Sequence, residues 1–168
     1  MRVVQAVDYH EPRDAISHDW ITFLNDLEMT PVLIPNGLKN PCQHLEECMP
    51  NLLILTGGDD LDELAVRDKT EQNLSKAASV HNIPVLGVCR GMQLINAIFG
   101  GINCAIKGHV NAPHQIYYKH SWVDFFGRQS TVNSFHNTEI RLEDLGTGLR
   151  AMAVDEDGFV EGFDHAEE

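Results

Sequence analysis

The stretch Ile83-Pro84-Val85-Leu86-Gly87-Val88-Cys89-Arg90-Gly91-Met92-Gln93 decides the fold. The apolar run from 84 to 88 is typical of a buried parallel strand, and residues 90–99 have the apolar spacing of an amphipathic helix. Cys89 therefore lies where a strand turns sharply into a helix. Gly87 and Gly91, two residues before and two residues after the thiol, leave room for that turn.

A thiol at such a turn has the pattern of a nucleophile elbow, in the form G-x-C-x-G. The turn pushes the side chain out of the sheet, and the free N–H groups at the start of the following helix favour the thiolate, which is the nucleophilic form. The alternative for a cysteine at a strand end is a small buried hydrophobic residue. The paired glycines and the flanking elements favour the nucleophile, so Cys89 is the predicted catalytic residue.

Strands and helices alternate through the first two thirds of the chain. Apolar strands are predicted at 2–7, 32–34, 51–55 and 84–88, and helices at 17–27, 70–80 and 90–99. This order predicts an α/β protein with a flavodoxin-like three-layer fold, in which helices cover both faces of a mainly parallel central sheet.

After residue 102 the pattern changes, and short β-prone runs predict a small β-rich excursion. These runs are 115–118, 121–125, 131–135, 149–154 and 159–163. The last two flank Asp155–Gly158, which is a good hairpin turn.

Length and charge limit the classes of function. A chain of 168 residues predicts one domain, 1–168, and its net charge of −13 argues against nucleic acid or an anionic membrane as partner. No apolar run is long enough to cross a bilayer, and the first eight residues lack the apolar length of a signal peptide. We therefore expect a cytoplasmic protein whose four cysteines stay reduced. No cofactor is expected, and His109, His114 and His120 are expected in a solvated loop rather than in a metal site.

A second motif, Thr56-Gly57-Gly58-Asp59-Asp60, ends the strand predicted at 51–55. Two glycines allow backbone N–H groups to approach a substrate oxygen closely. The N–H groups of Gly58 and of Arg90, the residue after the thiol, are the predicted oxyanion hole. The acidic cluster Asp59, Asp60, Asp62 and Glu63 is expected to face solvent, with a contact from Asp59 or Asp60 to a substrate amine as the alternative.

Four segments of the chain resemble segments of class I glutamine amidotransferase-like hydrolases and occur in the same order. They are Thr56–Leu61, Gly87–Gln93, Val132–His136 and Asp157–Phe163. The branch that they resemble most is that of the γ-glutamyl hydrolases typified by γ-glutamyl-γ-aminobutyrate hydrolase, which is peptidase C26-like. The resemblance runs from about Val3 to Glu168. Arg13–Trp20 also resembles, weakly, a branch that trims γ-glutamyl groups from surface-polysaccharide precursors.

The resemblance implies that a γ-glutamyl amide is hydrolysed through a thioester on Cys89, with release of glutamate and an amine. It implies further that Gln93 contacts the glutamyl group and that Ser134, Phe135 and His136 line its pocket. The amine that is released is not fixed by the sequence. The partner is then a small γ-glutamyl substrate, and a homodimer or a synthetase partner stays open.

In this family a His-Pro-Glu motif on a later strand supplies the proton carrier and the carboxylate that orients it. The chain has no such motif. Three explanations stay open: the chain lacks its C-terminal strand and is nearly inactive, the protein is a pseudoenzyme, or a substitute acts. His165 with Glu167 and, separately, His136 are the candidate substitutes, although His136 is favoured as a pocket residue.

Two further functions stay open beside γ-glutamyl amide hydrolysis. A glutaminase subunit that supplies ammonia to a synthetase would share the elbow. A binding or regulatory pseudoenzyme would keep the pocket without turnover.

Overall fold

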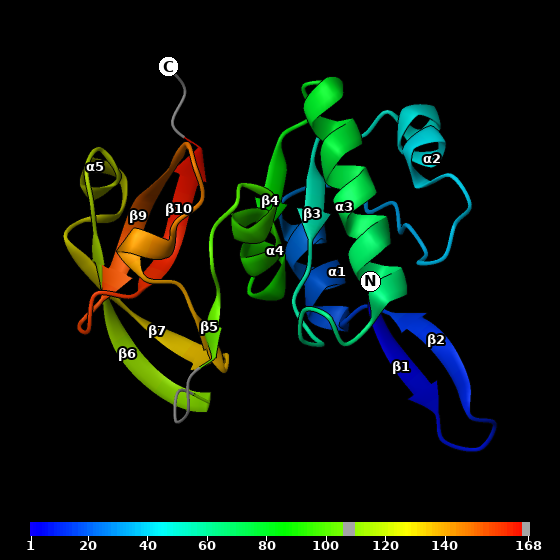
Figure 1. Cartoon of the computed structure of the whole chain (residues 1–168), viewed down its shortest axis with the longest axis horizontal. Helices are drawn as coiled ribbons and strands as arrows, with labels where there is room; N and C mark the ends of the chain where they lie inside the picture. Colours follow the sequence, from blue (N-terminus) through cyan, green and yellow to red (C-terminus); the bar gives the residue numbers. More distant parts are fainter. Residues whose placement is uncertain (106–109, 166–168) are drawn as a thin grey trace. The chain divides into compact units, whose positions relative to one another are not determined.

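The computed structural model describes residues 1–105 and 110–165, and the chain divides into two compact units, Met1–Leu94 and Ile95–Glu168 (Figure 1). The elements that begin in the first unit are β1 (Arg2–Ala6), β2 (Glu11–Ala15), α1 (His18–Asp26), α2 (Pro41–Cys48), β3 (Leu53–Leu55), α3 (Ala65–Val80), β4 (Val85–Gly87) and α4 (Arg90–Ile98). The expectation of a single domain over 1–168 stays a prediction.

Strands β3 and β4 pair in parallel and are joined through α3, as the sequence predicts. The register places Leu53 opposite Val85 and Leu55 opposite Gly87. Helix α3 lies beside β3 and begins at Ala65, five residues earlier than predicted. Its apolar face is buried as expected, at Leu74, Ala77 and Ala78. Because parallel strands end at the same edge, the segments after Leu55 and Gly87 meet there.

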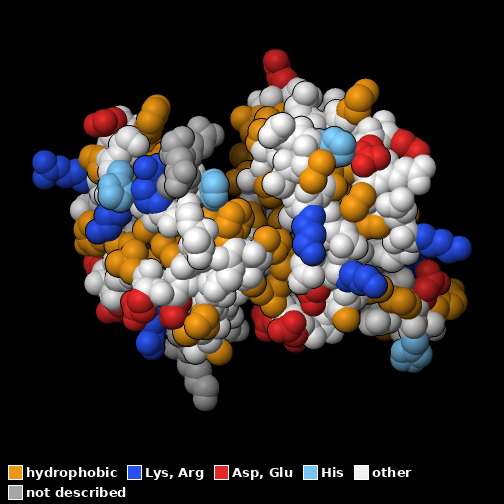
Figure 2. Space-filling model, turned by 45° about the horizontal axis from the view of Figure 1, so that its top comes forward, with side chains coloured by type: hydrophobic (Ala, Val, Ile, Leu, Met, Phe, Trp, Pro, Cys, Tyr) orange, Lys and Arg blue, Asp and Glu red, His pale blue; other side chains and the backbone are white. Residues whose placement is uncertain are grey.

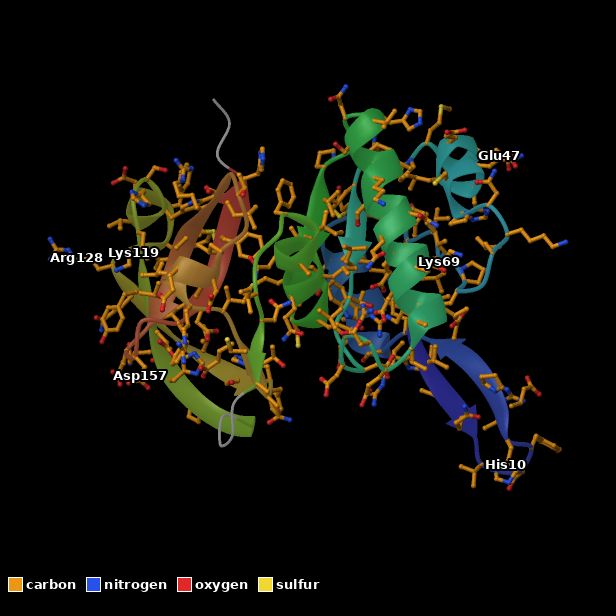
Figure 3. All side chains as sticks on the ribbon, in the orientation of Figure 1. His10, Glu47, Lys69, Lys119, Arg128 and Asp157 are labelled. Carbon is orange, nitrogen blue, oxygen red and sulfur yellow. The ribbon has the colours of Figure 1, made fainter. Side chains whose placement is uncertain are left out.

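The N-terminal strand has a different partner from the one predicted. β1 forms a hairpin with β2 over residues that were expected to be a loop, and its turn carries His10 (Figure 3). Residues 32–34, a predicted strand, have no strand structure. An apolar run shows that a strand can form but does not specify which strand it pairs with, so the periodicity could not distinguish a local hairpin from a central position.

The predicted fold class is therefore confirmed at its coarser level. The chain is α/β, but a mainly parallel flavodoxin-like sheet is not what its described residues form. Within residues 1–105 and 110–165, β3 and β4 are the one parallel pair. Figure 2 shows apolar side chains among the charged ones on the surface, and Leu86 of β4 is 44% exposed.

The second unit is built on a four-stranded antiparallel sheet in the order β10-β9-β6-β7. Its further elements are β5 (Cys104–Ala105), β6 (Val110–Tyr118), α5 (Trp122–Phe126), β7 (Gln129–Phe135), β8 (Thr138–Glu139), the 3-10 turn η1 (Leu142–Asp144), β9 (Leu149–Asp155) and β10 (Val160–His165). The β-rich region after residue 102 is confirmed. Asp157 lies in the predicted turn between β9 and β10 (Figure 3).

One β-prone run of this unit is helical. Residues 121–125 were expected to be a strand, but α5 occupies 122–126. The rings of Trp122 and Phe126, four residues apart, stack with centroids 5.9 Å apart, and Tyr118 stacks on Phe126 at 5.1 Å. Spacing of four residues is that of one helical turn, so this aromatic contact favours the helix.

Candidate active site

Cys89 lies between the end of β4 at Gly87 and the start of α4 at Arg90, in the predicted strand–turn–helix arrangement. Its φ is +54°, in the left-handed region, and its side chain is exposed. The N–H of Gly91 donates to the carbonyl of Val88 (3.0 Å), and that of Gln93 to the carbonyl of Cys89 (3.1 Å). A non-glycine residue in this conformation is strained, which is the mark of a nucleophile elbow.

Gly91 allows this turn to lie against the neighbouring strand. A methyl group at position 91 would stand 2.1 Å from the carbonyl oxygen of Leu55, so no side chain fits there. The N–H of Val88 donates to that same carbonyl at 2.9 Å. The first turn of α4 is therefore held at the end of β3, next to the segment that follows Leu55.

The Gly57–Gly58 loop reaches the thiol, as the sequence predicts. A methyl group at Gly57 would lie 3.2 Å from Cβ and 3.6 Å from Sγ of Cys89. Gly58 has a φ of +84°, a conformation that glycine adopts without strain. The backbone of this loop thus borders the exposed sulfur.

A buried cluster of charges supports both segments, and sequence reasoning missed it. The Arg90 side chain is 2% exposed and pairs with Asp68 and Glu71 of α3. Arg67, which is 0% exposed, pairs with Glu71 at 2.9 Å and with Asp59 at 2.8 Å. The spacing of Arg67 and Glu71, four residues apart in a helix, was the available signal.

The expectation that the acidic cluster faces solvent is correct for Asp60, Asp62 and Glu63, which are exposed. It is wrong for Asp59, which is half-buried against Arg67. The charge of that arginine explains the difference, because a carboxylate paired with it can leave water.

The predicted substrate-binding residues fall in both units. Gln93, one helical turn after the thiol, is 7% exposed. In the second unit Ser134 is 1% exposed and Phe135 is 61% exposed, while His136 is half-buried. The roles predicted for these four residues, and for the N–H groups of Gly58 and Arg90, stay predictions.

His136 belongs to a small ionic cluster within the second unit. Its Nε2 lies 3.6 Å from one oxygen of Glu161, and His114 Nε2 lies 3.5 Å from the other. His136 Nδ1 donates to the carbonyl of Thr138 at 3.1 Å, which leaves Nε2 directed at Glu161. The solvated-loop expectation is therefore wrong for His114, correct for the exposed His120, and outside the described residues for His109.

The cluster shifts the ionisation of its members. The hydrogen bond to Glu161 raises the pKa of His136, against the opposing effect of burial. Burial would raise the pKa of Glu161, but the hydrogen bonds and charges of His136 and His114 outweigh it and hold that pKa below its usual value. His136 thus has the carboxylate partner that a substitute proton carrier would need, and this role too stays a prediction.

The other candidate substitute is described only in part. His165 is exposed at the end of β10, with its ring 5.1 Å from that of Phe99, whereas Glu167 lies outside the described residues. Among the residues that are described, no group of three or more His, Cys, Asp or Glu side chains is arranged to hold a metal ion. In that same part of the chain, no helix combines the length and the apolar character that crossing a membrane requires.

The profile of the family described as Peptidase C26 matches residues 2–168. The chain belongs to the Peptidase C26 family. This confirms the resemblance to class I glutamine amidotransferase-like proteins that the four sequence segments indicate.

Two curated relatives of this C26 chain cover most of its length. The glutamine amidotransferase-like protein YvdE of Lactococcus lactis is 31% identical, over 88% of this chain and 74% of the relative. The gamma-glutamyl-CDP-amidate hydrolase of Campylobacter jejuni is 27% identical, over 98% of this chain and 80% of the relative.

Solved structures of amidotransferases share the fold. A GMP synthase subunit from Thermoplasma acidophilum superposes with a TM-score of 0.71 at 26% identity, over 88% of this C26 chain and 71% of the other. A glutamine amidotransferase from Thermotoga maritima gives a TM-score of 0.66 at 17% identity, over 87% and 64% of the two chains, and shows the fold alone.

The left-handed backbone at Cys89 predicts an unusual order of stability. Cys89→Gly should be more stable than Cys89→Ala by about 1 kcal/mol, because glycine adopts this φ without strain and alanine does not. The free energy of unfolding, from urea titrations of both variants, measures the difference. The same pair of substitutions at Cys42, in the first turn of α2, should give the reverse order. Equal stabilities at position 89 would contradict the elbow.

The His136–Glu161 pair predicts a pH-dependent stability. The pKa of His136 is raised, so its contribution to stability is complete below about pH 6.5 and is lost as the pH rises through that raised pKa. The pKa of Glu161 is lowered, so its contribution is complete above about pH 4.5 and is lost as the pH falls through that lowered pKa. His136→Asn should therefore lower the unfolding free energy by about 1–2 kcal/mol near pH 5.5, and by less near pH 9.

The control for that experiment is His120→Asn, which removes an exposed histidine at a φ of +51° that asparagine tolerates. It should change the unfolding free energy by less than about 0.5 kcal/mol, as surface substitutions usually do. A cost of His136→Asn that is the same at both pH values would show that the ion pair does not form.

Proposed function

We propose that the protein hydrolyses γ-glutamyl amides through a thioester on Cys89, releasing glutamate and an amine. The observation that carries the proposal is the exposed thiol at a φ of +54°, with the Gly57–Gly58 loop against it. Membership of the Peptidase C26 family supports amide hydrolysis, and a relative whose name is gamma-glutamyl-CDP-amidate hydrolase supports the γ-glutamyl group. The cytoplasmic location predicted from the sequence stays a proposal.

In the proposed reaction Sγ of Cys89, as the thiolate, attacks the γ-carbonyl carbon of the substrate. The carbonyl oxygen becomes an oxyanion, which the N–H groups of Gly58 and Arg90 would hold. The C–N bond then breaks, the amine takes up a proton, and a γ-glutamyl thioester is left on the sulfur. Water cleaves the thioester, which gives glutamate and restores the thiol.

The contact with the glutamyl group predicted for Gln93 of the first unit, and separately for Ser134–His136 of the second, stays a proposal. A glutamyl group carries an α-amino and an α-carboxylate group, so its binding needs both donors and acceptors. Gln93 and Ser134 each carry a donor and an acceptor, and both side chains are nearly buried.

Replacement of the thiol tests the proposal. Cys89→Ala should lower glutamate release from a set of γ-glutamyl amides by at least about a thousandfold, because the covalent step needs the sulfur. Release is measured with a coupled glutamate assay, and circular dichroism shows that the variant folds. Cys104→Ala, at a half-buried thiol whose Sγ lies 3.7 Å from Asp144, is the control and should keep wild-type activity.

Iodoacetamide separates the possible failures of this test. The exposed Cys89 should react faster than the half-buried Cys42, Cys48 and Cys104. A wild-type chain that is labelled at Cys89 but releases no glutamate would show that a reactive thiol is not sufficient for hydrolysis. Turnover that survives in Cys89→Ala would overturn the mechanism.

A glutaminase that feeds a synthetase is the second candidate, because the GMP synthase subunit from Thermoplasma shares the fold at 26% identity. The two candidates differ in the amine that they release. A glutaminase subunit would prefer glutamine and release ammonia, whereas an amide hydrolase of the proposed kind would prefer a larger γ-glutamyl amide. Comparison of kcat/KM for glutamine and for γ-glutamyl anilides distinguishes them.

A further inference from the structure

Every N–H group of the Arg67 side chain donates a hydrogen bond. The acceptors are carbonyls of the loop beside the thiol and the carboxylates around it. Nη2 donates to the carbonyls of Thr56 (2.8 Å) and Gly57 (3.1 Å). Nη1 donates to the carbonyl of Gly58 (2.9 Å) and to Asp59 (2.8 Å), and Nε donates to Glu71 at 2.9 Å. A guanidinium group has five N–H donors, so this side chain is fully satisfied.

Three successive carbonyls that converge on one cation fix the orientation of three peptide planes. These peptides are trans, so each N–H points opposite to its own C=O. The N–H groups of Gly57, Gly58 and Asp59 therefore point away from Arg67.

The same cluster reaches the other side of the thiol. Glu71 accepts from Arg67 and also from Arg90, which begins α4 directly after Cys89. Asp68 pairs with Arg90 as well. The buried charges thus connect the loop at 56–59 with the turn that carries the nucleophile, within the first unit.

We infer that Arg67 is a positioning residue, which aligns the Gly58 N–H for the oxyanion formed when Cys89 attacks its substrate. This inference rests on the proposed function. Arg67 is 0% exposed, so it would act through the backbone of residues 56–58. Lysine carries the same charge but has a single nitrogen, which cannot serve three carbonyls and two carboxylates together.

Arg67→Lys in the full chain tests this role by separating two reactions of the same sulfur. Hydrolysis passes through an oxyanion, whereas alkylation by iodoacetamide does not. The variant should lose kcat by at least about tenfold, while KM and the alkylation rate of Cys89 change by less than about twofold. Inhibition by the γ-aldehyde analogue of glutamate, whose thiohemiacetal oxygen occupies the oxyanion position, should weaken by the same factor as kcat.

Leu74→Ala provides the matched control for lost stability. Leu74 is 4% exposed on the same helix α3, and its apolar side chain donates no hydrogen bond to the loop. This variant should melt at a lower temperature and yet keep the wild-type ratio of kcat to alkylation rate. Lys69→Ala, at an exposed cation of α3 labelled in Figure 3, should change neither quantity.

Amide hydrogen exchange tests the inference without any turnover. The N–H groups of residues 57–59 should exchange faster in Arg67→Lys than in wild type or in Leu74→Ala. If the wild-type chain hydrolyses no γ-glutamyl amide, the proposed function fails and this exchange measurement still decides whether Arg67 holds the loop.

A second variant covers the case in which Arg67→Lys does not fold. Asp59→Asn removes one charged partner of Arg67 and keeps the three carbonyl contacts, so kcat should fall by about two- to fivefold with the alkylation rate unchanged. Wild-type kcat, aldehyde inhibition and exchange in a folded Arg67→Lys or Asp59→Asn variant would overturn the inference.

Discussion

At Gly91 the first turn of α4 lies so close to the end of β3 that the position has room only for a hydrogen atom. This contact holds the turn at Cys89 beside the Gly57–Gly58 loop. A bulkier residue would push the helix away from Leu55, and the sulfur would move away from the loop amides with it. The left-handed backbone at Cys89 is the strain that accompanies this approach, and it points the thiol toward solvent.

Charge is distributed unevenly in this acidic chain. Most of its carboxylates face water, whereas Arg67 and Arg90 are buried with three acidic partners below the candidate site. Such pairs contribute little net stability, because the loss of hydration offsets their attraction. What they fix is geometry: the carbonyls of residues 56–58 on one side and the start of α4 on the other. The cluster is therefore part of the structure that holds the candidate site.

The parts that the sequence predicts well are those in which local pattern and local structure coincide. The elbow at Cys89 follows from an apolar run, two glycines and a helical period in one continuous stretch. The turn at Asp155–Gly158 and the helix predicted at 17–27 are likewise local, and the structure confirms both. The four family segments add the chemistry, which periodicity alone does not contain.

The predictions that fail concern a partner strand, a short aromatic segment and a buried charge. An apolar strand at 2–7 pairs with residues 11–15 instead of joining a central sheet, and nothing in its alternation distinguishes the two outcomes. Helix α5 replaces a β-prone run because Trp122 and Phe126 stack across one helical turn. The burial of Arg67 was not predicted either, since a charged residue in an amphipathic helix is expected to face water.

The most direct test of the account is the detection of the acyl-enzyme itself. The protein is mixed with a γ-glutamyl ester, quenched in acid within the first turnover and digested, and the peptide that contains Cys89 is analysed by mass spectrometry. The account predicts one glutamyl group on that peptide, removed by hydroxylamine as a thioester would be. Glutamate that accumulates while Cys89 stays unmodified, or a glutamyl group on another residue, would contradict it.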